Sequence, residues 1–233
     1  MDAAAFFDSQ YKETAGKQEL SDALTISKTF DPNHARLHYN SIERSIIKSL
    51  ARIDFKSPNP SVLDIGSGSG HWIDFYQSCY GSTRSVGVDL SRYSIDALQK
   101  KYQNDGRVAL VLADVSSADF SLDERFDIIS AIGVMFHIVS DEKCIRALKT
   151  FSEHLKVGGV AIIGGQFGWI TRDVFFLKRG DTVEVTKRIR SRKWWRTAVE
   201  RTGLEVACFQ KTKNERGVLF PENNILILRK PEK

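Results

Sequence analysis

The stretch SVLDIGSGSGHW, from Ser61 to Trp72, joins a short apolar run to three glycines spaced two residues apart. The apolar residues around Asp64 do not alternate strictly, which is typical of a parallel strand covered on both faces. Gly66, Gly68 and Gly70 predict a tight strand-to-helix turn, because glycine tolerates positive φ and lets a ligand approach the backbone. Free amides at the following helix start favour hydrogen-bond acceptors. The stretch therefore predicts a nucleotide-type binding site.

This glycine pattern differs from two common nucleotide motifs. A dinucleotide fingerprint GxGxxG would need a glycine at position 71, where the chain has His71. A phosphate loop would need GKS or GKT after its second glycine, and neither is present. A nicotinamide-dependent dehydrogenase and a P-loop enzyme are therefore disfavoured.

Strand-like apolar runs alternate with helix-like segments along the chain. A helix at 30–53 begins at Asp31 as cap and Pro32, and the break at 56–60 separates it from the first strand. Its apolar residues fall at helical spacing: Leu37, Ile42, Ile46, Ile47 and Leu50. Further strands are predicted at 82–90, 107–115, 126–134 and 160–167. The alternation predicts a parallel, doubly wound α/β sheet with right-handed crossovers.

The later part of the chain departs from this alternation. The helix after the fourth strand is expected to end at Gly158 and Gly159 as C-cap residues. An insertion with aromatic and charged residues follows, and Ser191 then opens a last helix. Two final strands, 204–212 and 223–230, have no helix between them. They predict an antiparallel pair at the sheet edge.

An acidic residue ends two of the predicted strands: Asp89 in VGVDL and Asp114 in ALVLADV. With DIGSGSG, they make the chain resemble the class I S-adenosylmethionine-dependent methyltransferases, whose signature is (D/E)xGxGxG after a strand. The resemblance covers residues 61–167 best. It implies a seven-stranded, mostly parallel, Rossmann-like sheet with an antiparallel last strand. It also implies a helical lid or extension at 1–57 and a core at 58–233 with a substrate-cap insertion at about 168–190.

The resemblance implies that S-adenosyl-L-methionine is bound and S-adenosyl-L-homocysteine released. Asp89 would accept from both ribose hydroxyls, and Asp114 and the Val115 amide would hold the adenine. Asp64 would orient the loop or accept from the ammonium group. The implied cofactor-binding residues are Asp64, Gly66, Ser67, Gly68, Gly70, Asp89, Leu90, Asp114, Val115 and Ala131.

Methyl transfer requires an acceptor atom aligned with the donor and, for a hydroxyl, removal of a proton. His137 follows the fourth strand, where the resembled family often lines its substrate pocket, and it titrates near neutrality. It is the predicted catalytic residue, as a general base or as a group that positions the acceptor. In the alternative interpretation it only packs between Phe136 and Ile138. No metal is expected, since His34 and His38 lack a third ligand.

The acceptor is predicted to be a small molecule methylated at oxygen or nitrogen. Its candidate contacts are Arg36, Tyr39, Gln166 and Trp169. Between residues 172 and 216 there are 13 Lys or Arg against 6 Asp or Glu, which favours an anionic acceptor. Two alternatives stay open: an RNA or protein methyltransferase that uses this basic surface, or a non-catalytic cofactor-binding partner subunit.

Composition predicts a cytoplasmic protein. No apolar stretch reaches the roughly 20 residues of a membrane span, and the N-terminus shows no signal-peptide pattern. The three cysteines are widely separated, so neither a disulfide framework nor a metal motif is expected.

Overall fold

The computed structural model describes residues 3–15, 20–22, 25, 31–165, 170–179, 183–211 and 224–232. Its central sheet has seven strands in the order β3-β2-β1-β4-β5-β9-β8. These are β1 (Ser61–Ile65), β2 (Arg84–Asp89), β3 (Val108–Leu112), β4 (Phe126–Ile132), β5 (Leu155–Gly164), β8 (Glu205–Gln210) and β9 (Ile225–Arg229). The first five strands pair in parallel, whereas β9 runs antiparallel to both β5 and β8. The predicted fold class is confirmed.

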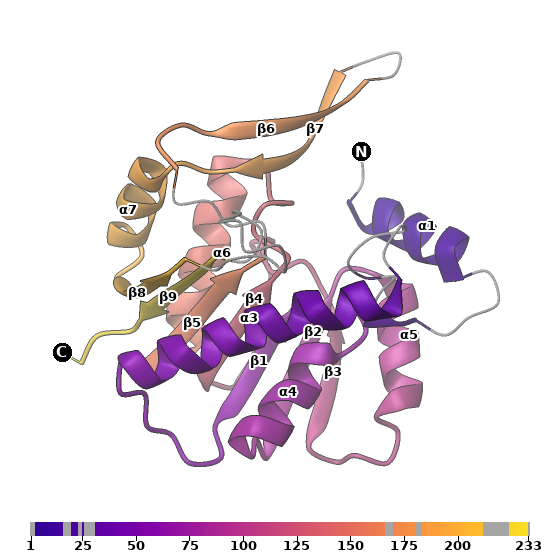
Figure 1. The fold of residues 1–233 in the computed structure, drawn as a ribbon, viewed down its shortest axis with the longest axis horizontal. Helices are drawn as coiled ribbons and strands as arrows, with labels where there is room; N and C mark the ends of the chain where they lie inside the picture. The colour runs from indigo at the N-terminus through magenta and orange to yellow at the C-terminus, as the bar shows by residue number, and fades with distance from the viewer. Residues whose placement is uncertain are drawn as a thin grey trace.

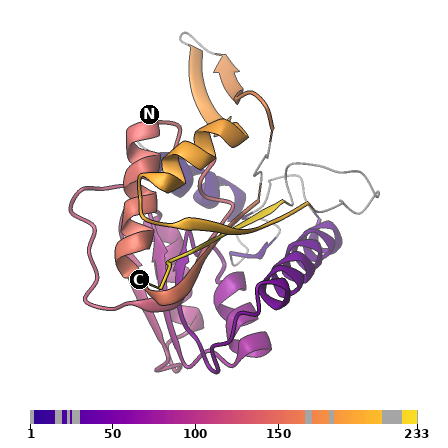
Figure 2. The ribbon, with the colours of Figure 1, turned by 90° about the vertical axis from the view of Figure 1, so that its left-hand side faces the viewer.

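Helices cover both faces of this sheet (Figure 1). They are α1 (Ala3–Ala15), α3 (Pro32–Arg52), α4 (His71–Tyr80), α5 (Arg92–Lys101), α6 (Asp141–His154) and α7 (Arg192–Glu200). Figure 2 shows the sheet between α6 on one side and α3 on the other. Apolar residues of α6 and α7 form one buried cluster with the sheet, and those of α3 and α4 form a second on the opposite face. The strands are therefore covered on both faces, as their apolar composition requires.

Helix α3 begins where the sequence predicts. The Asp31 carboxylate accepts from the amides of Asn33 and His34, and Pro32 takes the first helical position, where no amide is needed. The predicted apolar face is only partly right: Ile42, Ile46 and Leu50 are buried, but Leu37 is 51% exposed and Ile47 45% exposed. The buried face of α3 is therefore narrower than the spacing of its apolar residues predicted.

The boundary between α6 and β5 was predicted wrongly. Helix α6 ends at His154, and Gly158 and Gly159 lie inside β5 rather than at a helix C-cap. The Gly158 amide donates to the Lys230 carbonyl (2.9 Å), and the Lys230 amide donates to Gly159 (3.0 Å). A Cβ on Gly159 would lie 2.9–3.1 Å from three backbone oxygens. Glycine is needed there because the sheet backbone is crowded.

A two-stranded antiparallel ribbon of β6 (Val174–Arg179) and β7 (Val183–Ile189) lies within the predicted insertion at 168–190. It projects beyond the central sheet (Figure 1). At its base the Arg188 amide donates to the Phe136 carbonyl (2.8 Å), which ties the ribbon to the segment after β4. The sequence indicated an insertion at this place but not its strands.

Candidate functional site

The glycine loop between β1 and α4 folds back onto the end of β2. The amides of Gly66 and Ser67 both donate to the Val88 carbonyl, at 2.7 and 3.2 Å. Gly66 and Gly68 have φ of +72° and +52°, and a Cβ on Gly66 would overlap the Val134 side chain. Both positions therefore require glycine for conformation, and Gly66 requires it for space as well.

Asp89, at the end of β2, joins the glycine loop to the start of α5. Its Oδ2 accepts from the Gly68 amide (2.9 Å) and its Oδ1 from the Ser91 amide (2.9 Å). Burial raises the pKa of Asp89, although the amides of Ser91 and Gly68 act against that rise. Each oxygen can accept a second hydrogen bond, so the carboxylate can hold the loop and also bind ligand hydroxyls. Leu90 is half-buried beside it.

Asp64, next to the glycine loop on β1, is a fully buried carboxyl without a hydrogen-bond partner in the part of the chain that the structure describes. Burial raises its pKa to about 7. An unpaired buried carboxylate is unfavourable unless a cation or donor reaches it. A ligand ammonium group fits this requirement.

Asp114 shapes the turn after β3. Its Oδ1 accepts from both the amide (2.8 Å) and the hydroxyl (2.6 Å) of Ser116. Val115 is buried, and its carbonyl accepts from Thr150 (3.4 Å), which fixes the turn against α6. Ala131 lies in β4, with its side chain in the buried cluster of α6 and α7. Thus Asp114 and Val115 are held at the sheet's carboxyl edge, while the side chain of Ala131 is core.

His137 lies just after β4 and is enclosed by aromatic rings. Its ring centroid is 4.1 Å from that of Phe136 and 5.0 Å from that of Phe7 on α1. Burial lowers the pKa of His137 to about 3, and the nearby Lys187 ammonium acts in the same direction. The imidazole is therefore neutral and weakly basic at physiological pH.

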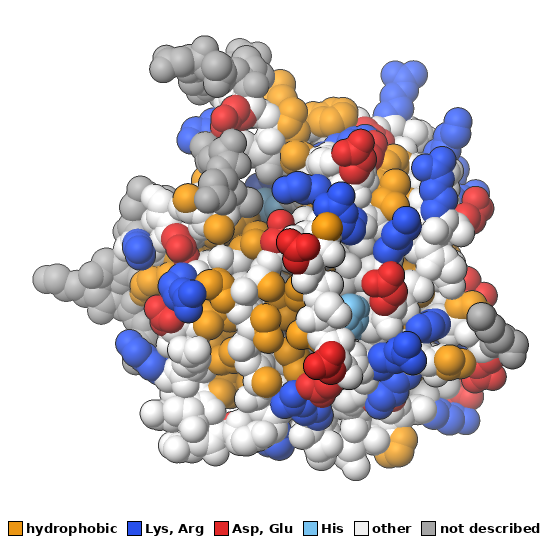
Figure 3. Space-filling view, turned by 180° about the vertical axis from the view of Figure 1, so that it is seen from behind, with side chains coloured by type: hydrophobic (Ala, Val, Ile, Leu, Met, Phe, Trp, Pro, Cys, Tyr) orange, Lys and Arg blue, Asp and Glu red, His pale blue; other side chains and the backbone are white. Residues whose placement is uncertain are grey.

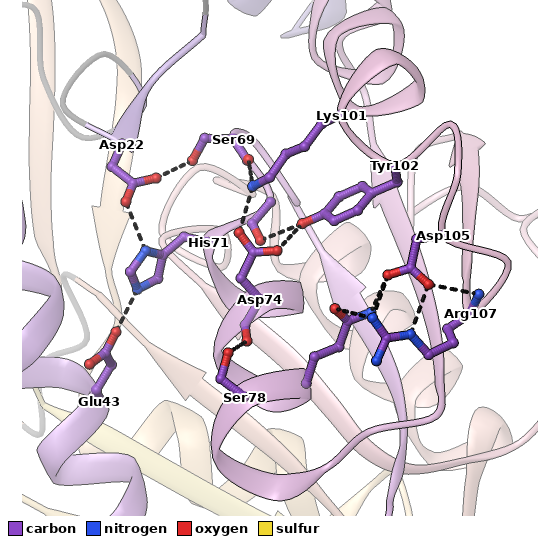
Figure 4. Close-up of polar contacts among 12 residues, drawn as sticks. Asp22, Glu43, Ser69, His71, Asp74, Ser78, Lys101, Tyr102, Asp105 and Arg107 are labelled. Atoms are coloured by element: carbon purple, nitrogen blue, oxygen red, sulfur yellow. Dashed lines mark hydrogen bonds and ion pairs between the residues drawn. The ribbon is translucent and has the colours of Figure 1, made fainter.

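The candidate acceptor contacts are not gathered in one place. Arg36 is exposed on α3, whereas Tyr39 is buried and stacks on His71 with ring centroids 3.8 Å apart. Gln166 and Trp169 lie outside the described residues. His71, the first residue of α4, contacts two carboxylates, Asp22 and Glu43 (Figure 4).

Sequence reasoning missed the contribution of α1. Its Asp8 accepts from the Ser91 hydroxyl (2.6 Å) and the Tyr93 amide (3.2 Å), directly beside Asp89. Tyr11 is buried, and burial together with the Asp89 charge raises its pKa. The spacing of Phe7 and Tyr11, four residues apart, was the one local signal of a helix face that packs.

Part of the basic C-terminal stretch serves the fold. Arg190 is 1% exposed and donates to Asp141 (3.0 Å) and to the carbonyls of Val139 and Ser140. Arg188 pairs with Asp141 and Asp173. On the face in Figure 3, basic side chains are interspersed with acidic ones rather than gathered in one patch. This arrangement weakens the nucleic-acid interpretation.

The described residues form neither a metal-ligand cluster nor a membrane-spanning helix. No group of three or more His, Cys, Asp or Glu side chains is placed to hold a metal ion. No described helix is long and apolar enough to cross a membrane.

Residues 62–159 match a family model described as "Methyltransferase domain". The chain is 34% identical over 104 residues to the cypemycin N-terminal methyltransferase of a Streptomyces species, covering 44% of this chain and 40% of that protein. It is 26% identical over 141 residues to a dTDP-3-amino-3,4,6-trideoxy-alpha-D-glucopyranose N,N-dimethyltransferase of Streptomyces venezuelae, covering 57% and 56% respectively. The matches thus span about half the length of these relatives.

The fold has solved counterparts. The crystal structure of an S-adenosylmethionine-dependent methyltransferase from Clostridium acetobutylicum superposes with a TM-score of 0.64 at 15% identity, covering 98% of this chain and 99% of that one. The predicted resemblance to the class I S-adenosylmethionine-dependent methyltransferases is confirmed over residues 62–159. The similar proteins support the predicted enzyme class and the predicted cofactor, S-adenosylmethionine.

The residues present fit this cofactor. The orphaned carboxyl of Asp64 suits its ammonium group, and Asp89 retains acceptor capacity for hydroxyls. The Asp114 turn adds a further carboxylate at the same edge of the sheet. These groups come from the ends of three neighbouring parallel strands, where open α/β sheets bind their ligands.

Proposed function

We propose that the protein transfers a methyl group from S-adenosylmethionine to a small-molecule acceptor. Of the two predicted acceptor atoms, oxygen and nitrogen, we propose that nitrogen is methylated. The proposal rests on His137, which is neutral and enclosed by Phe7 and Phe136. Of the two relatives described above, one is named as an N,N-dimethyltransferase and the other as an N-terminal methyltransferase, which supports the choice of nitrogen.

The chemistry of the two acceptors differs in its need for a base. The bound cofactor supplies a methyl group that its sulfonium charge already activates. A neutral amine attacks through its own lone pair, whereas a hydroxyl must lose a proton to become a good nucleophile. A histidine with a pKa of about 3 is a poor base for that proton. The apolar surroundings of His137 therefore suit an amine.

The aromatic wall also favours the reactive form of the amine. Burial against Phe7 and Phe136 disfavours charge, so an amine held there loses its proton more readily than in water. His137 would position the acceptor by packing its ring beside it rather than remove a proton. The Lys187 ammonium lies 5.2 Å from the Phe136 ring centroid, which supports an acceptor that also carries an anionic group.

The cofactor-binding roles remain part of this proposal. Asp64 would accept from the ammonium group and Asp89 from the ribose hydroxyls. Asp114 and the Val115 amide would hold the adenine, with the glycine loop passing under the methionine and ribose. Helices α1 and α3 and the β6–β7 ribbon would border the acceptor, with Arg36, Gln166 and Trp169 as further candidate contacts.

The test is incubation of the protein with isotopically labelled cofactor and paired acceptors: small amines and the alcohols of the same carbon skeleton, each with and without a carboxylate. Mass spectrometry would detect the labelled product. We expect methylated amines. Methylation of the alcohols alone, or of added RNA alone, would overturn the proposal. Cofactor binding without any turnover would favour a non-catalytic partner subunit.

A further inference from the structure

His71, the first residue of α4, has both ring nitrogens bound to carboxylates from different parts of the chain. Nδ1 lies 2.8 Å from Oδ2 of Asp22, and Nε2 lies 2.8 Å from Oε1 of Glu43 on α3 (Figure 4). A carboxylate only accepts hydrogen bonds, so satisfying both contacts requires a proton on each nitrogen. The geometry is that of an imidazolium between two acids.

Asp22 extends this contact to the glycine loop. Its Oδ1 accepts from the Ser69 hydroxyl at 2.6 Å. Lys101 holds Ser69 from the other side, because its ammonium donates to the Ser69 carbonyl (2.8 Å) and to Asp74 (2.6 Å). Ser69 is thus fixed through both its side chain and its backbone.

Thr25 makes a second contact between the N-terminal segment and the same loop. Its hydroxyl lies 3.1 Å from the Tyr39 hydroxyl, and its methyl group would be 3.1 Å from a Cβ on Gly68. Tyr39 stacks on His71 with ring centroids 3.8 Å apart and an interplanar angle of 17°. Residues 22 and 25 therefore lie against Gly68 and Ser69, beside the carboxylate of Asp89.

The charges around His71 favour its protonated form. The titratable groups that face it are Asp22 from the N-terminal segment, Glu43 and Tyr39 from α3 and Asp64 from β1, with Lys101 of α5 acting on Asp22. Burial alone would lower the pKa of His71, but the hydrogen bonds to Asp22 and Glu43 outweigh it and raise the pKa to about 9.

We propose that His71 is a positioning residue for the methyl donor: as an imidazolium it holds Asp22 against Ser69 and so keeps the glycine loop in the shape that binds the donor. Loss of the proton removes one of the two hydrogen bonds, because a neutral ring donates only from one nitrogen. Donor affinity then falls as the ring deprotonates. The inference concerns the donor half of the proposed function and needs no acceptor for its test.

The experiment is calorimetric titration of the full chain with S-adenosylhomocysteine between about pH 7.5 and 10, spanning the deprotonation of His71. We expect the wild-type affinity to fall about fivefold across this range, centred near pH 9, as one charge-assisted hydrogen bond is lost. His71→Gln should bind about fivefold more weakly already at the lower pH, and its affinity should then change with pH only through the ligand's own amino group.

His154→Gln is the matched control. His154 is also a buried, hydrogen-bonded histidine, which accepts from the Leu122 amide (3.0 Å) but lies away from the loop. Its variant should keep the wild-type affinity and pH profile even if it melts at a lower temperature. Should His71→Gln fail to fold, Glu43→Gln should move the fall in affinity to lower pH.

A wild-type affinity that stays flat across the pH range, or a folded His71→Gln protein that binds as wild type does, would overturn the inference. An unchanged pH profile in Glu43→Gln would also count against it. Failure of the wild-type protein to bind S-adenosylhomocysteine at any pH would refute the donor site itself, so the two failures are distinguishable.

Discussion

Asp64 on β1 lies level with Ser130 on β4 in the parallel register, and both side chains are fully buried. Neither the Asp64 carboxyl oxygens nor the Ser130 hydroxyl has a hydrogen-bond partner among the described residues. The two central strands thus carry buried polar groups that have no hydrogen-bond partner among the described atoms of the protein. This arrangement costs stability in the absence of the cofactor and favours binding in its presence.

Asp64→Asn should stabilise the cofactor-free protein at pH 8. Burial raises the pKa of Asp64 to about 7, so the cost of ionising it in the fold grows as pH rises from about 4 and is complete above about 7. The pKa shift corresponds to a gain of at most about 4 kcal/mol in the free energy of unfolding when the charge is removed. The net gain is smaller, because an unpaired buried amide costs about 1–3 kcal/mol.

Urea denaturation at pH 5 and pH 8 measures this effect. The gain should be smaller at pH 5, where wild-type Asp64 is largely protonated in the fold. The same variant should bind S-adenosylhomocysteine at least about tenfold more weakly, since a charge-assisted hydrogen bond is lost. A variant that is less stable than wild type at pH 8 and binds normally would contradict this interpretation.

Asp89→Ala should reduce cofactor affinity strongly, by about a hundredfold, because the carboxylate orders the Gly68 amide and would also receive the ribose hydroxyls. Asp96→Ala, on the exposed face of α5, is the control and should bind as wild type does. Titration with S-adenosylhomocysteine gives both values. An unchanged dissociation constant for Asp89→Ala would remove this residue from the ribose site.

His137→Phe should keep most of the turnover, because a phenyl ring preserves the packing against Phe7 and Phe136. His137→Ala should lower turnover more than cofactor affinity, since it opens the pocket wall. With a pKa of about 3, His137 should produce no inflection in the activity profile between pH 6 and 9. Loss of about a hundredfold or more in kcat for His137→Phe, with intact cofactor binding, would restore the role of general base.

Arg190→Met should destabilise the fold by about 2 kcal/mol. The guanidinium is 1% exposed, and its loss removes its hydrogen bonds to the half-buried carbonyls of Val139 and Ser140, which then rely on Arg188 and the Cys144 amide. Arg192→Met, two residues away and exposed, is the matched control and should change stability little. Equal denaturation midpoints for the two variants would show that the buried arginine contributes nothing.

The donor half of the site could be predicted from sequence because its signals are local. Glycine spacing, an acidic residue at each strand end and helix caps such as Asp31 all act within a few residues of one another. The parallel direction of the first five strands then follows from the alternation of strand and helix. The roles of individual residues in binding stay predictions.

Other features depend on contacts between distant residues. Asp8 meets Ser91 across 83 positions, and Asp22 meets His71 across 49, so no local pattern signals either contact. Gly158 and Gly159 resembled a helix C-cap because the crowding that demands Gly159 comes partly from the backbone oxygens of Phe126 and Asp127 on β4, which are distant in the chain. The pKa of His137 likewise depends on α1 and β7, which the chain brings together only after folding.

Strand β9 lies between β5 and β8 although it follows both in the chain. During synthesis, the edge of β5 therefore stays unpaired until residue 229 has left the ribosome, and β8 has no neighbour before then. An open edge of this kind can pair with other chains. A nascent chain stalled between residues 165 and 224 would be the species most in need of a chaperone, and mutations that slow pairing of β9 would reduce yield without touching the methyl-donor site.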